Sequence, residues 1–219
     1  MISSDFREKL SARARAAGLD VPEQAFEPLE RYFRLLGQWN RKINLTALPL
    51  QRPTAETFDR LLIEPLAAAS YVGISAGRWL DVGSGGGSPA FPMKILHPAL
   101  RLTMVESRGR KAAFLREVVR QLGLEDVAVE NDRLETLAER LGAGSVDLIT
   151  LRAVKGDDRL FDSIRQILVP GGRALVFRSA GAEGDVPAGF RKRMEVTLPT
   201  GGQSRLAIFE PVFHVEQSG

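Results

Sequence analysis

A run of glycines directly after a short apolar stretch is the clearest sign of chemistry in this sequence. Residues 79–82 are apolar except for Asp81, and four glycines follow within residues 83–87. Because glycine has no Cβ and tolerates positive φ, such a loop turns tightly and lets a ligand lie against its backbone. At the carboxyl end of a parallel strand, loops of this kind bind nucleotide-like cofactors. The predicted cofactor-binding residues here are Asp81, Gly83, Gly85 and Gly87.

The residues after these glycines favour S-adenosylmethionine over a dinucleotide. A dinucleotide fingerprint requires a third glycine at the position of Ser88. Pro89 and Pro92 delay the next helix and move it away from the place where a pyrophosphate would bind its N-terminus. The carboxylate of Asp81 also suits a neutral or cationic cofactor better than a pyrophosphate. Ser88 therefore joins the predicted cofactor-binding residues, and a dehydrogenase is the least favoured function.

A second acid follows a second apolar stretch. Residues 102–106 read as a buried strand that ends in Glu106. An acid at the end of the second strand is placed to accept hydrogen bonds from the ribose hydroxyls of an adenosine cofactor. The alternative is a solvated charge at the end of a strand. The preceding glycine loop favours the ribose role.

The composition excludes several kinds of site. The chain has 219 residues and a mass of 24.0 kDa, enough for one sizeable core or one domain with an appendage. It lacks cysteine, which excludes disulfides and a cysteine nucleophile and is compatible with a reducing cytoplasm. Its two histidines, His97 and His214, are isolated, so we expect no metal site. Without a bilayer-spanning apolar run or a signal-peptide pattern, we expect a cytoplasmic protein with no membrane partner.

The elements that position these residues divide the chain in two. Residues 1–72 are predicted to form a helical extension, with helices over 4–17, 22–45 and 54–71. Residues 73–219 are predicted to form the cofactor-binding domain, because strands alternate with helices there. The predicted strands are residues 79–82, 102–106, 127–130, 146–151, 173–177, 194–198 and 205–210. The last two have no helix between them, so the fold class is α/β, a Rossmann-like parallel sheet with a terminal antiparallel pair.

This pattern resembles the class I methyltransferases, and within them one family in particular. The sequence is similar to the small-subunit ribosomal RNA methyltransferase G family, also called glucose-inhibited division protein B, over nearly its whole length. The motifs that carry the resemblance are Trp39-Asn40 with Asn44-Leu45-Thr46, Asp81 to Pro89, Glu106-Ser107 with Lys111 and Phe114-Leu115, Arg133-Leu134-Glu135, and Arg152-Ala153 after the fourth strand.

The resemblance implies methylation of guanine N7 in small-subunit ribosomal RNA, with S-adenosylmethionine as cofactor. It implies cofactor contacts at Gly83, Ser88, Leu134, Glu135 and Arg152. It places the RNA-facing basic residues at Arg133, Arg152, Arg178 and Arg205. The expected partner is therefore ribosomal RNA or the small ribosomal subunit, and we expect the chain to act as a monomer.

The sequence departs from the family pattern at five positions. A histidine and an aspartate of the family are replaced by Leu61 and Glu64, and the glycine after the cofactor loop is replaced by Ala90. A lysine at the end of the fifth strand is Arg178, and a histidine after Arg205 is Leu206.

The chemistry of the implied reaction asks little of the protein beyond positioning. Guanine N7 carries a free lone pair, so no general base is required, and Arg152 is the nearest candidate for a catalytic residue. Its guanidinium suits a guanine edge, a phosphate or the cofactor carboxylate. The alternative for Arg152 is a salt bridge to Asp147 or Asp157. Methylation of pyrimidine C5 requires a cysteine nucleophile, which the chain lacks. Exocyclic-amine methylation fits worse than N7 methylation, because its usual Asn/Asp-Pro-Pro-aromatic motif does not follow the fourth strand.

The basic residues allow two interpretations. The formal charge of +3 and a sequence pI near 9.5 permit a polyanionic partner without requiring one. The runs at residues 108–111 and 191–193 are each typical of a solvated face, whereas together with the four arginines they would form a phosphate-binding rim. Two other functions stay open: a methyltransferase of the same fold that acts on a small molecule or protein, and a non-catalytic cofactor-binding factor in ribosome assembly.

Overall fold

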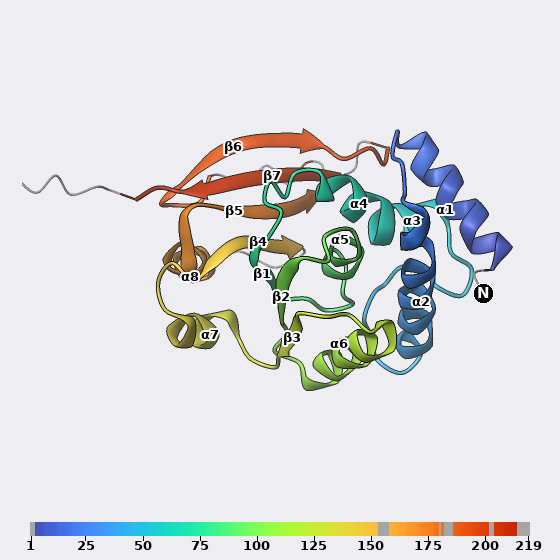
Figure 1. Ribbon diagram of the computed structural model, residues 1–219, viewed down its shortest axis with the longest axis horizontal. Helices are drawn as coiled ribbons and strands as arrows, with labels where there is room; N and C mark the ends of the chain where they lie inside the picture. Colours follow the sequence, from blue (N-terminus) through green and yellow to red (C-terminus); the bar gives the residue numbers. More distant parts are fainter. Residues whose placement is uncertain (1–2, 153–157, 180, 182–185, 202–203, 214–219) are drawn as a thin grey trace, which may run out of the picture.

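The protein, seen here in a computed structural model that describes residues 3–152, 158–179, 181, 186–201 and 204–213, is built on one mixed sheet (Figure 1). The strands are β1 (Gly77–Val82), β2 (Leu100–Val105), β3 (Val127–Glu130), β4 (Val146–Arg152), β5 (Leu168–Ser179), β6 (Phe190–Thr197) and β7 (Ser204–Pro211). Among the described residues their order in the sheet is β3-β2-β1-β4-β5-β7-β6. The strands β1 to β5 are parallel, and β7 runs antiparallel to β5 and β6. The predicted Rossmann-like sheet with its terminal antiparallel pair is confirmed.

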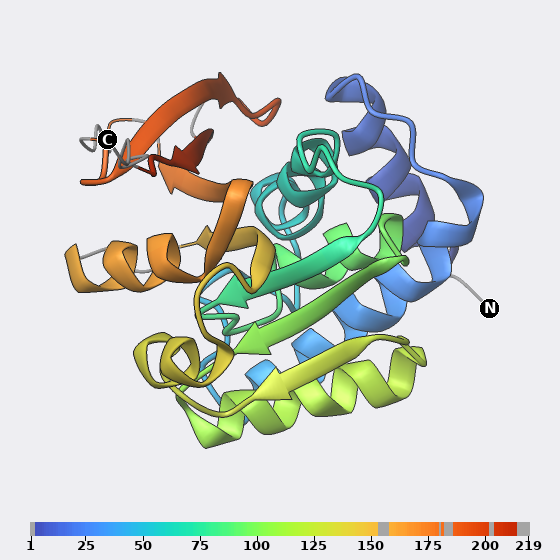
Figure 2. The ribbon, with the colours of Figure 1, turned by 60° about the vertical axis from the view of Figure 1, so that its left-hand side comes forward.

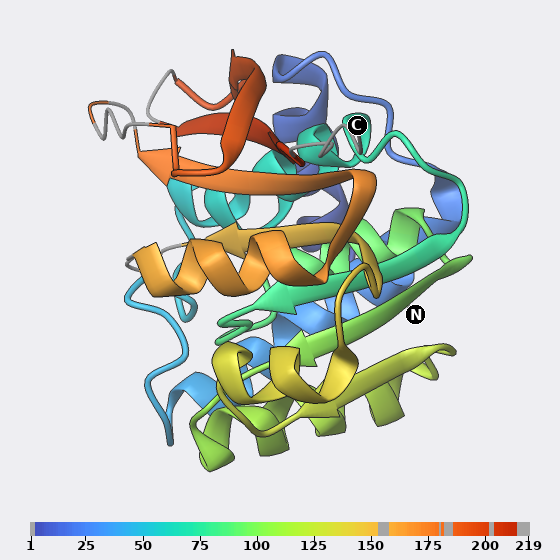
Figure 3. The ribbon, with the colours of Figure 1, turned by 90° about the vertical axis from the view of Figure 1, so that its left-hand side faces the viewer.

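Helices cover both faces of this sheet (Figures 1 and 3). They are α1 (Ser4–Ala16), α2 (Glu23–Asn40), α3 (Ala55–Phe58), the π-helix η1 (Asp59–Ile63), α4 (Glu64–Ala69), α5 (Ala90–Leu96), α6 (Gly109–Leu122), α7 (Leu134–Leu141) and α8 (Asp158–Ile167). Figure 3 shows α7 and α8 on the near face, with the remaining helices behind the sheet. Within the described residues, no helix is both long enough and apolar enough to cross a membrane.

The two faces of the sheet bury two separate apolar cores. Leu148 packs into the core that also holds residues of α1, α2, α5 and α6, whereas the next residue, Ile149, packs into the core with α7 and α8. This alternation follows from the pleat, which points successive side chains to opposite faces. A parallel sheet covered on both faces buries side chains on both sides, and in β4 the consecutive residues Leu148 and Ile149 are both fully buried. The helical extension thus shares one core with the sheet.

The helix α2 fixes the extension to the sheet. Its buried residues include Leu29, Tyr32 and Leu36, which recur at helical spacing. Aromatic contacts join it to the next layer: the ring centroids of Tyr32 and Phe91 lie 5.4 Å apart, and those of Trp39 and Phe114 lie 5.7 Å apart. The helix ends at Asn40 rather than near residue 45, because the Asn40 side chain bonds the backbone of Leu45 and Thr46.

The helix predicted over residues 54–71 is interrupted by a π-helical turn. The N–H of Glu64 bonds the carbonyl of Asp59, five residues back, and Pro65 has no N–H to donate. The carbonyls of Arg60 and Leu61 therefore lack their usual α-helical partners. Both accept hydrogen bonds from residues at the carboxyl edge of the sheet, as described below.

Some predicted boundaries were wrong near the end of the sheet. Residues 168–172, which precede the strand predicted over 173–177, also belong to β5, which begins directly after α8. The pairing with β4 shifts register between Val146 and Leu148, and this irregularity accommodates Gly171 at φ +80°. The strand β6 begins at Phe190, four residues before the predicted start.

Candidate functional site

A cavity of about 660 Å³ opens at the carboxyl edge of the parallel strands. The glycine loop after β1, Glu106 after β2 and Arg152 at the end of β4 form one side of it. The helical extension forms the other side, with residues of the loop after α2 and of α3 and η1. The lining residues from the extension are Leu36, Leu45, Thr46, Ala47, Leu48, Glu56, Arg60 and Leu61. The volume lies within the range of about 300–1,000 Å³ that is usual for small-molecule sites.

The glycine loop needs its glycines for its backbone shape. Gly83, Gly85 and Gly87 have φ values of +68°, +51° and +83°. A Cβ on Gly87 would lie 2.3 Å from the ring of Phe91, so Gly87 serves close packing and does not line the cavity. A Cβ on Gly85 would meet only Gly83 O at 3.6 Å and Lys111 Nζ at 4.0 Å. The Gly85 backbone is thus open to a ligand.

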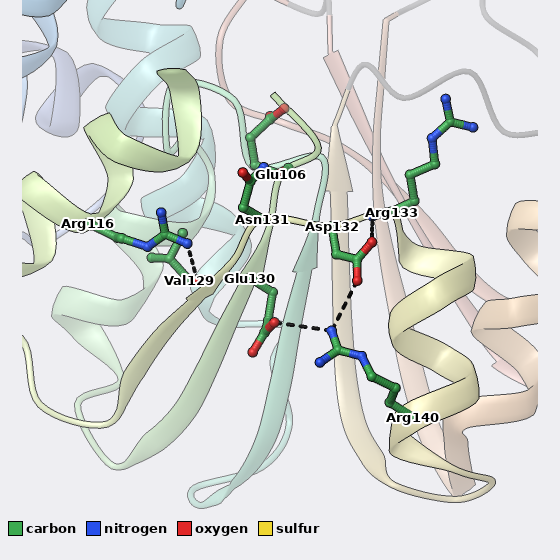
Figure 4. A network of polar contacts seen from close by, with 8 residues as sticks. All are labelled: Glu106, Arg116, Val129, Glu130, Asn131, Asp132, Arg133 and Arg140. Carbon is green, nitrogen blue, oxygen red and sulfur yellow. Dashed lines mark hydrogen bonds and ion pairs between the residues drawn. The ribbon is translucent and has the colours of Figure 1, made fainter. Parts of the chain in front are cut away.

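Glu106 shapes this loop with its own carboxylate. Its Oε2 accepts a hydrogen bond of 2.9 Å from the Gly85 N–H, and its Oε1 accepts one of 2.8 Å from the Arg108 N–H. The Asn131 side chain, which lies beside Glu106 in Figure 4, donates to the Glu106 carbonyl at 2.9 Å. Glu106 is 6% exposed and borders two cavities. The alternative of a solvated strand-end charge was wrong, because the carboxylate is buried and hydrogen-bonded.

Asp81 lies beneath the loop and is 1% exposed. Its Oδ1 accepts a hydrogen bond of 2.5 Å from the Thr150 hydroxyl, which accepts one of 2.9 Å from the Trp79 indole. Its Oδ2 is buried and has no hydrogen-bond partner among the described residues. Burial raises the pKa of Asp81 to about 6, although the Thr150 bond and the charge of Arg152 oppose the rise. A buried acceptor without a partner invites a donor from a bound ligand.

The helical extension holds the glycine loop from the other side. The Tyr32 hydroxyl donates to the Gly86 carbonyl at 2.8 Å, and burial raises the pKa of Tyr32. The Ser88 hydroxyl donates to the Leu61 carbonyl at 3.1 Å, one of the two carbonyls that the π-turn exposes. Ser88 lines the cavity, but its hydroxyl in this structure positions the loop.

Removing the Tyr32 hydroxyl tests this positioning. Tyr32→Phe leaves the partly buried Gly86 carbonyl without its donor, so we expect a loss of about 1 kcal/mol in unfolding free energy. We also expect weaker cofactor binding by calorimetry, because the loop loses its restraint. Tyr71→Phe is the matched control, since its hydroxyl bonds no described residue. Equal cofactor affinity in Tyr32→Phe and the wild type would show that Tyr32 only packs.

Arg152 is the centre of a largely buried network at the wall of the cavity. Its Nη2 lies 2.8 Å from Glu64 Oε2, its Nη1 donates to the Arg60 carbonyl, and its guanidinium lies 4.3 Å from the Phe177 ring centroid. Thr200 donates to the other Glu64 oxygen at 3.0 Å. Burial lowers the pKa of Arg152 to about 10, which Glu64 counteracts. Arg152 therefore stays charged at neutral pH.

The expected alternative partners of Arg152 were wrong or lie outside the described residues. Asp147 instead accepts bonds from the backbone and side chain of Arg78, and Asp157 is not described, nor are Ala153 and His214. Glu64, seen in the sequence only as a departure, is the true partner. Leu61 lines the cavity, whereas Ala90 and Leu206 are buried in the core.

A second cavity of about 270 Å³ adjoins the first and shares Gly83 and Glu106 with it. Leu134 and Glu135, the predicted cofactor contacts, and Arg133, predicted to face the RNA, line it. Figure 4 shows Arg140 bridging Glu130 and Asp132, while the Arg133 side chain extends away from them. Among the described residues the Arg133 guanidinium has no ion pair. Its contact with RNA and the cofactor contacts of Leu134 and Glu135 stay predictions.

The other predicted RNA-facing arginines are engaged within the protein. Arg178 and Arg205 are paired across β5 and β7. Arg178 lies 5.0 Å from the Phe209 ring centroid, and Arg205 lies 3.6 Å from Glu195. In the basic run of β6, Arg191 and Arg193 bond Glu210, and Lys192 bonds Glu195. Within the described part of the chain, no group of three or more acidic or histidine side chains is placed to hold a metal ion.

Sequence reasoning did not identify which residues of the extension line this site. Thr46, Glu56 and Arg60 line the cavity without having been predicted as site residues. The available signals were the Asn-Leu-Thr motif and the proline at position 65 inside a helical pattern. Asn40 explains the first signal, because it holds the loop that carries Leu45 and Thr46 to the cavity.

Comparison with known proteins agrees with this geometry. The chain is 44% identical over 161 residues to the ribosomal RNA small subunit methyltransferase G of Xylella fastidiosa strain M23, covering 72% of this chain and 69% of that protein. It is 34% identical over 191 residues to the protein of the same name from Geobacillus thermodenitrificans, covering 86% and 77%. A crystal structure of a SAM-dependent methyltransferase from Aquifex aeolicus shares the fold, with a TM-score of 0.57 at 17% identity over 71% of this chain and 93% of that chain. The profile of the GidB family, rRNA small subunit methyltransferase G, matches residues 25–196, and the chain belongs to that family.

Proposed function

We propose that this chain transfers the methyl group of S-adenosylmethionine to N7 of a guanine in small-subunit ribosomal RNA. As a member of its family, the chain is an S-adenosylmethionine-dependent methyltransferase of small-subunit ribosomal RNA. Guanine N7 as the acceptor is the finer part of the proposal, and it rests on the resemblance of the motifs. The observation that carries the proposal is the cavity in which the glycine loop, Glu106 and Arg152 meet.

The residues present fit the cofactor. Asp81 Oδ2, buried without a donor among the described residues, suits the cofactor ammonium group, and the open backbone at Gly85 suits its amino-acid portion. Gly83 lines the same cavity. Each Glu106 oxygen accepts one backbone N–H and keeps a lone pair for a ribose hydroxyl. The second cavity, beside Leu134 and Glu135, suits the adenine base. When bound, the cofactor supplies an electrophilic methyl group on its sulfonium.

The acceptor side of the cavity fits a nucleophile that needs no deprotonation. Methyl transfer to the N7 lone pair is an in-line displacement, for which holding donor and acceptor at attack distance is the main requirement. The product ring is cationic, and Glu56 offers a carboxylate in the cavity wall that no described residue pairs. Such a carboxylate stabilises the charge that develops during the transfer. Arg60 in the same wall offers a donor for the guanine O6 or a phosphate.

Transfer of a labelled methyl group to small ribosomal subunits tests this proposal. The subunits come from a strain of the host that lacks this gene, and the product nucleoside is identified by mass spectrometry. We expect N7-methylguanosine at one position. A different methylated nucleoside would overturn the N7 assignment. No transfer to subunits or to extracted RNA, with cofactor binding intact by calorimetry, would instead support another acceptor or a non-catalytic assembly factor.

We propose further that the chain acts as a monomer on the small subunit in the cytoplasm. The support is the composition, which lacks cysteine, and a helical extension whose apolar side is buried against the sheet. Sedimentation of the pure protein is expected to give one species of about 24.0 kDa.

A further inference from the structure

A basic groove adjoins the cofactor cavity and includes the basic run at residues 108–111. A groove of about 410 Å³ lies between the loop after α2 and the start of α6. Its side chains include four cations and no acid. The residues that line it are Lys42, Ile43, Asn44, Arg108, Gly109, Arg110 and Lys111. We call this feature the α6 groove.

The cations of the α6 groove are unpaired. Among the described residues, none of the side chains of Lys42, Arg108, Arg110 and Lys111 makes a hydrogen bond or an ion pair. The basic run of β6 differs, because Glu210 and Glu195 take up its charges. Four like charges that face one groove without a counter-charge repel one another, so the groove attracts an anionic ligand.

The backbone at the start of α6 adds N–H donors, which favour an anionic ligand as the four cations do. This helix has 14 residues, and no side chain caps its first turn. The first intrahelical bonds run from Lys111 and Ala112 to the Arg108 carbonyl, so the amides of Gly109 and Arg110 precede the bonded ladder. Unbonded amides at a helix N-terminus, together with the helix dipole, favour phosphate groups.

The position of the groove beside the cofactor cavity indicates which anionic ligand it binds. Lys111 lines both the α6 groove and the cofactor cavity, so the two adjoin at this residue. Figure 2 shows α6 alongside β3 at the edge of the sheet, away from the strands β6 and β7. We propose that the α6 groove binds consecutive phosphates of the RNA strand that carries the methylated base. This inference rests on the proposed function and assigns the phosphate contacts to Lys42, Arg108, Arg110 and Lys111.

RNA binding as a function of salt concentration tests the groove. The variants are Arg110→Gln and the triple substitution Lys42→Gln, Arg108→Gln, Arg110→Gln, which spares Lys111 in the cofactor cavity. Arg101→Gln is the matched control, because Arg101 is exposed near the amino end of β2, the opposite edge of the sheet. The probe is transcribed small-subunit ribosomal RNA. Calorimetry with S-adenosylhomocysteine checks that the cofactor site is intact.

Phosphate binding in the α6 groove is supported if each lost cation lowers the magnitude of the slope of log affinity against log salt concentration by about one. The triple variant is then expected to lower it by about three. Arg101→Gln is expected to keep the wild-type slope, and all variants are expected to keep their affinity for S-adenosylhomocysteine. A wild-type slope in the triple variant, or an equally lowered slope in Arg101→Gln, would overturn the proposed binding of RNA phosphates in the α6 groove. Methyl transfer by the wild type would in that case leave the proposed function standing. If the wild type neither binds nor methylates the RNA, both proposals fall.

Discussion

Arg152→Ala is expected to abolish methyl transfer and to destabilise the protein by about 3–5 kcal/mol, because it leaves the buried Glu64 carboxylate without a counter-charge. Glu64 is 2% exposed, and Arg152 is its only cationic partner among the described residues. The same substitution removes the donor to the Arg60 carbonyl and the cation over the Phe177 ring. The expected result is a lower midpoint of thermal or urea unfolding together with no measurable incorporation of labelled methyl groups.

A companion substitution separates the structural role of Arg152 from its functional one. Arg152→Ala with Glu64→Gln removes both charges, so we expect it to recover most of the lost stability. If Arg152 contacts the cofactor or the RNA, this double variant stays inactive although it is folded. Recovery of methyl transfer in the double variant would show that Arg152 only neutralises Glu64. Arg152→Lys keeps the charge but loses the planar fork, so we expect partial stability and little activity.

The sheet could be predicted from the sequence because its signals are local. Alternating apolar strands and amphipathic helices specify a parallel sheet, and the terminal pair without a helix specifies the antiparallel end. The boundaries that failed depend on distant contacts. The end of α2 depends on Asn40 bonding Leu45 and Thr46, and the start of β5 depends on pairing with Val146 across a register shift.

Only those residues of the site that form a local sequence pattern could be predicted. Asp81, the glycines and Glu106 lie in one strand-loop pattern, so their chemistry can be read along the chain. The wall formed by Glu56 and Arg60 depends on the fold of the extension over the carboxyl edge. The π-turn positions this wall, because its two free carbonyls accept hydrogen bonds from Arg152 and Ser88. These partners lie 92 and 27 residues away in the sequence. Pro65 marked a break in the helical pattern, but nothing local indicated which side chains would use those carbonyls.

Asp81→Asn is expected to stabilise the free protein at neutral pH. Burial raises the pKa of Asp81 from 3.8 to about 6, so the folded state binds the proton more tightly than the unfolded chain does. The contribution of Asp81 to stability is therefore greatest below about pH 4 and is lost as the pH rises through about 6. A difference of about two pKa units corresponds to roughly 3 kcal/mol. Urea unfolding at several pH values is expected to show that the substitution adds about 1–3 kcal/mol to the unfolding free energy at about pH 7.5 and nothing at about pH 4.

The same substitution is expected to weaken cofactor binding, although it stabilises the free protein. Because the two effects have opposite signs, a loss of affinity cannot be explained by a loss of stability. If the ionised Oδ2 accepts a hydrogen bond from the cofactor ammonium group, Asp81→Asn loses a charge-assisted bond worth about 1.5–3 kcal/mol, or roughly ten- to hundredfold in affinity. The wild type is then expected to lose affinity for S-adenosylhomocysteine as the pH falls below about 6, where Asp81 becomes protonated. The variant has no carboxyl to titrate, so its affinity is expected to change less over the same pH range. Equal affinities and parallel pH profiles for the two proteins would mean that Asp81 supports the glycine loop without touching the cofactor.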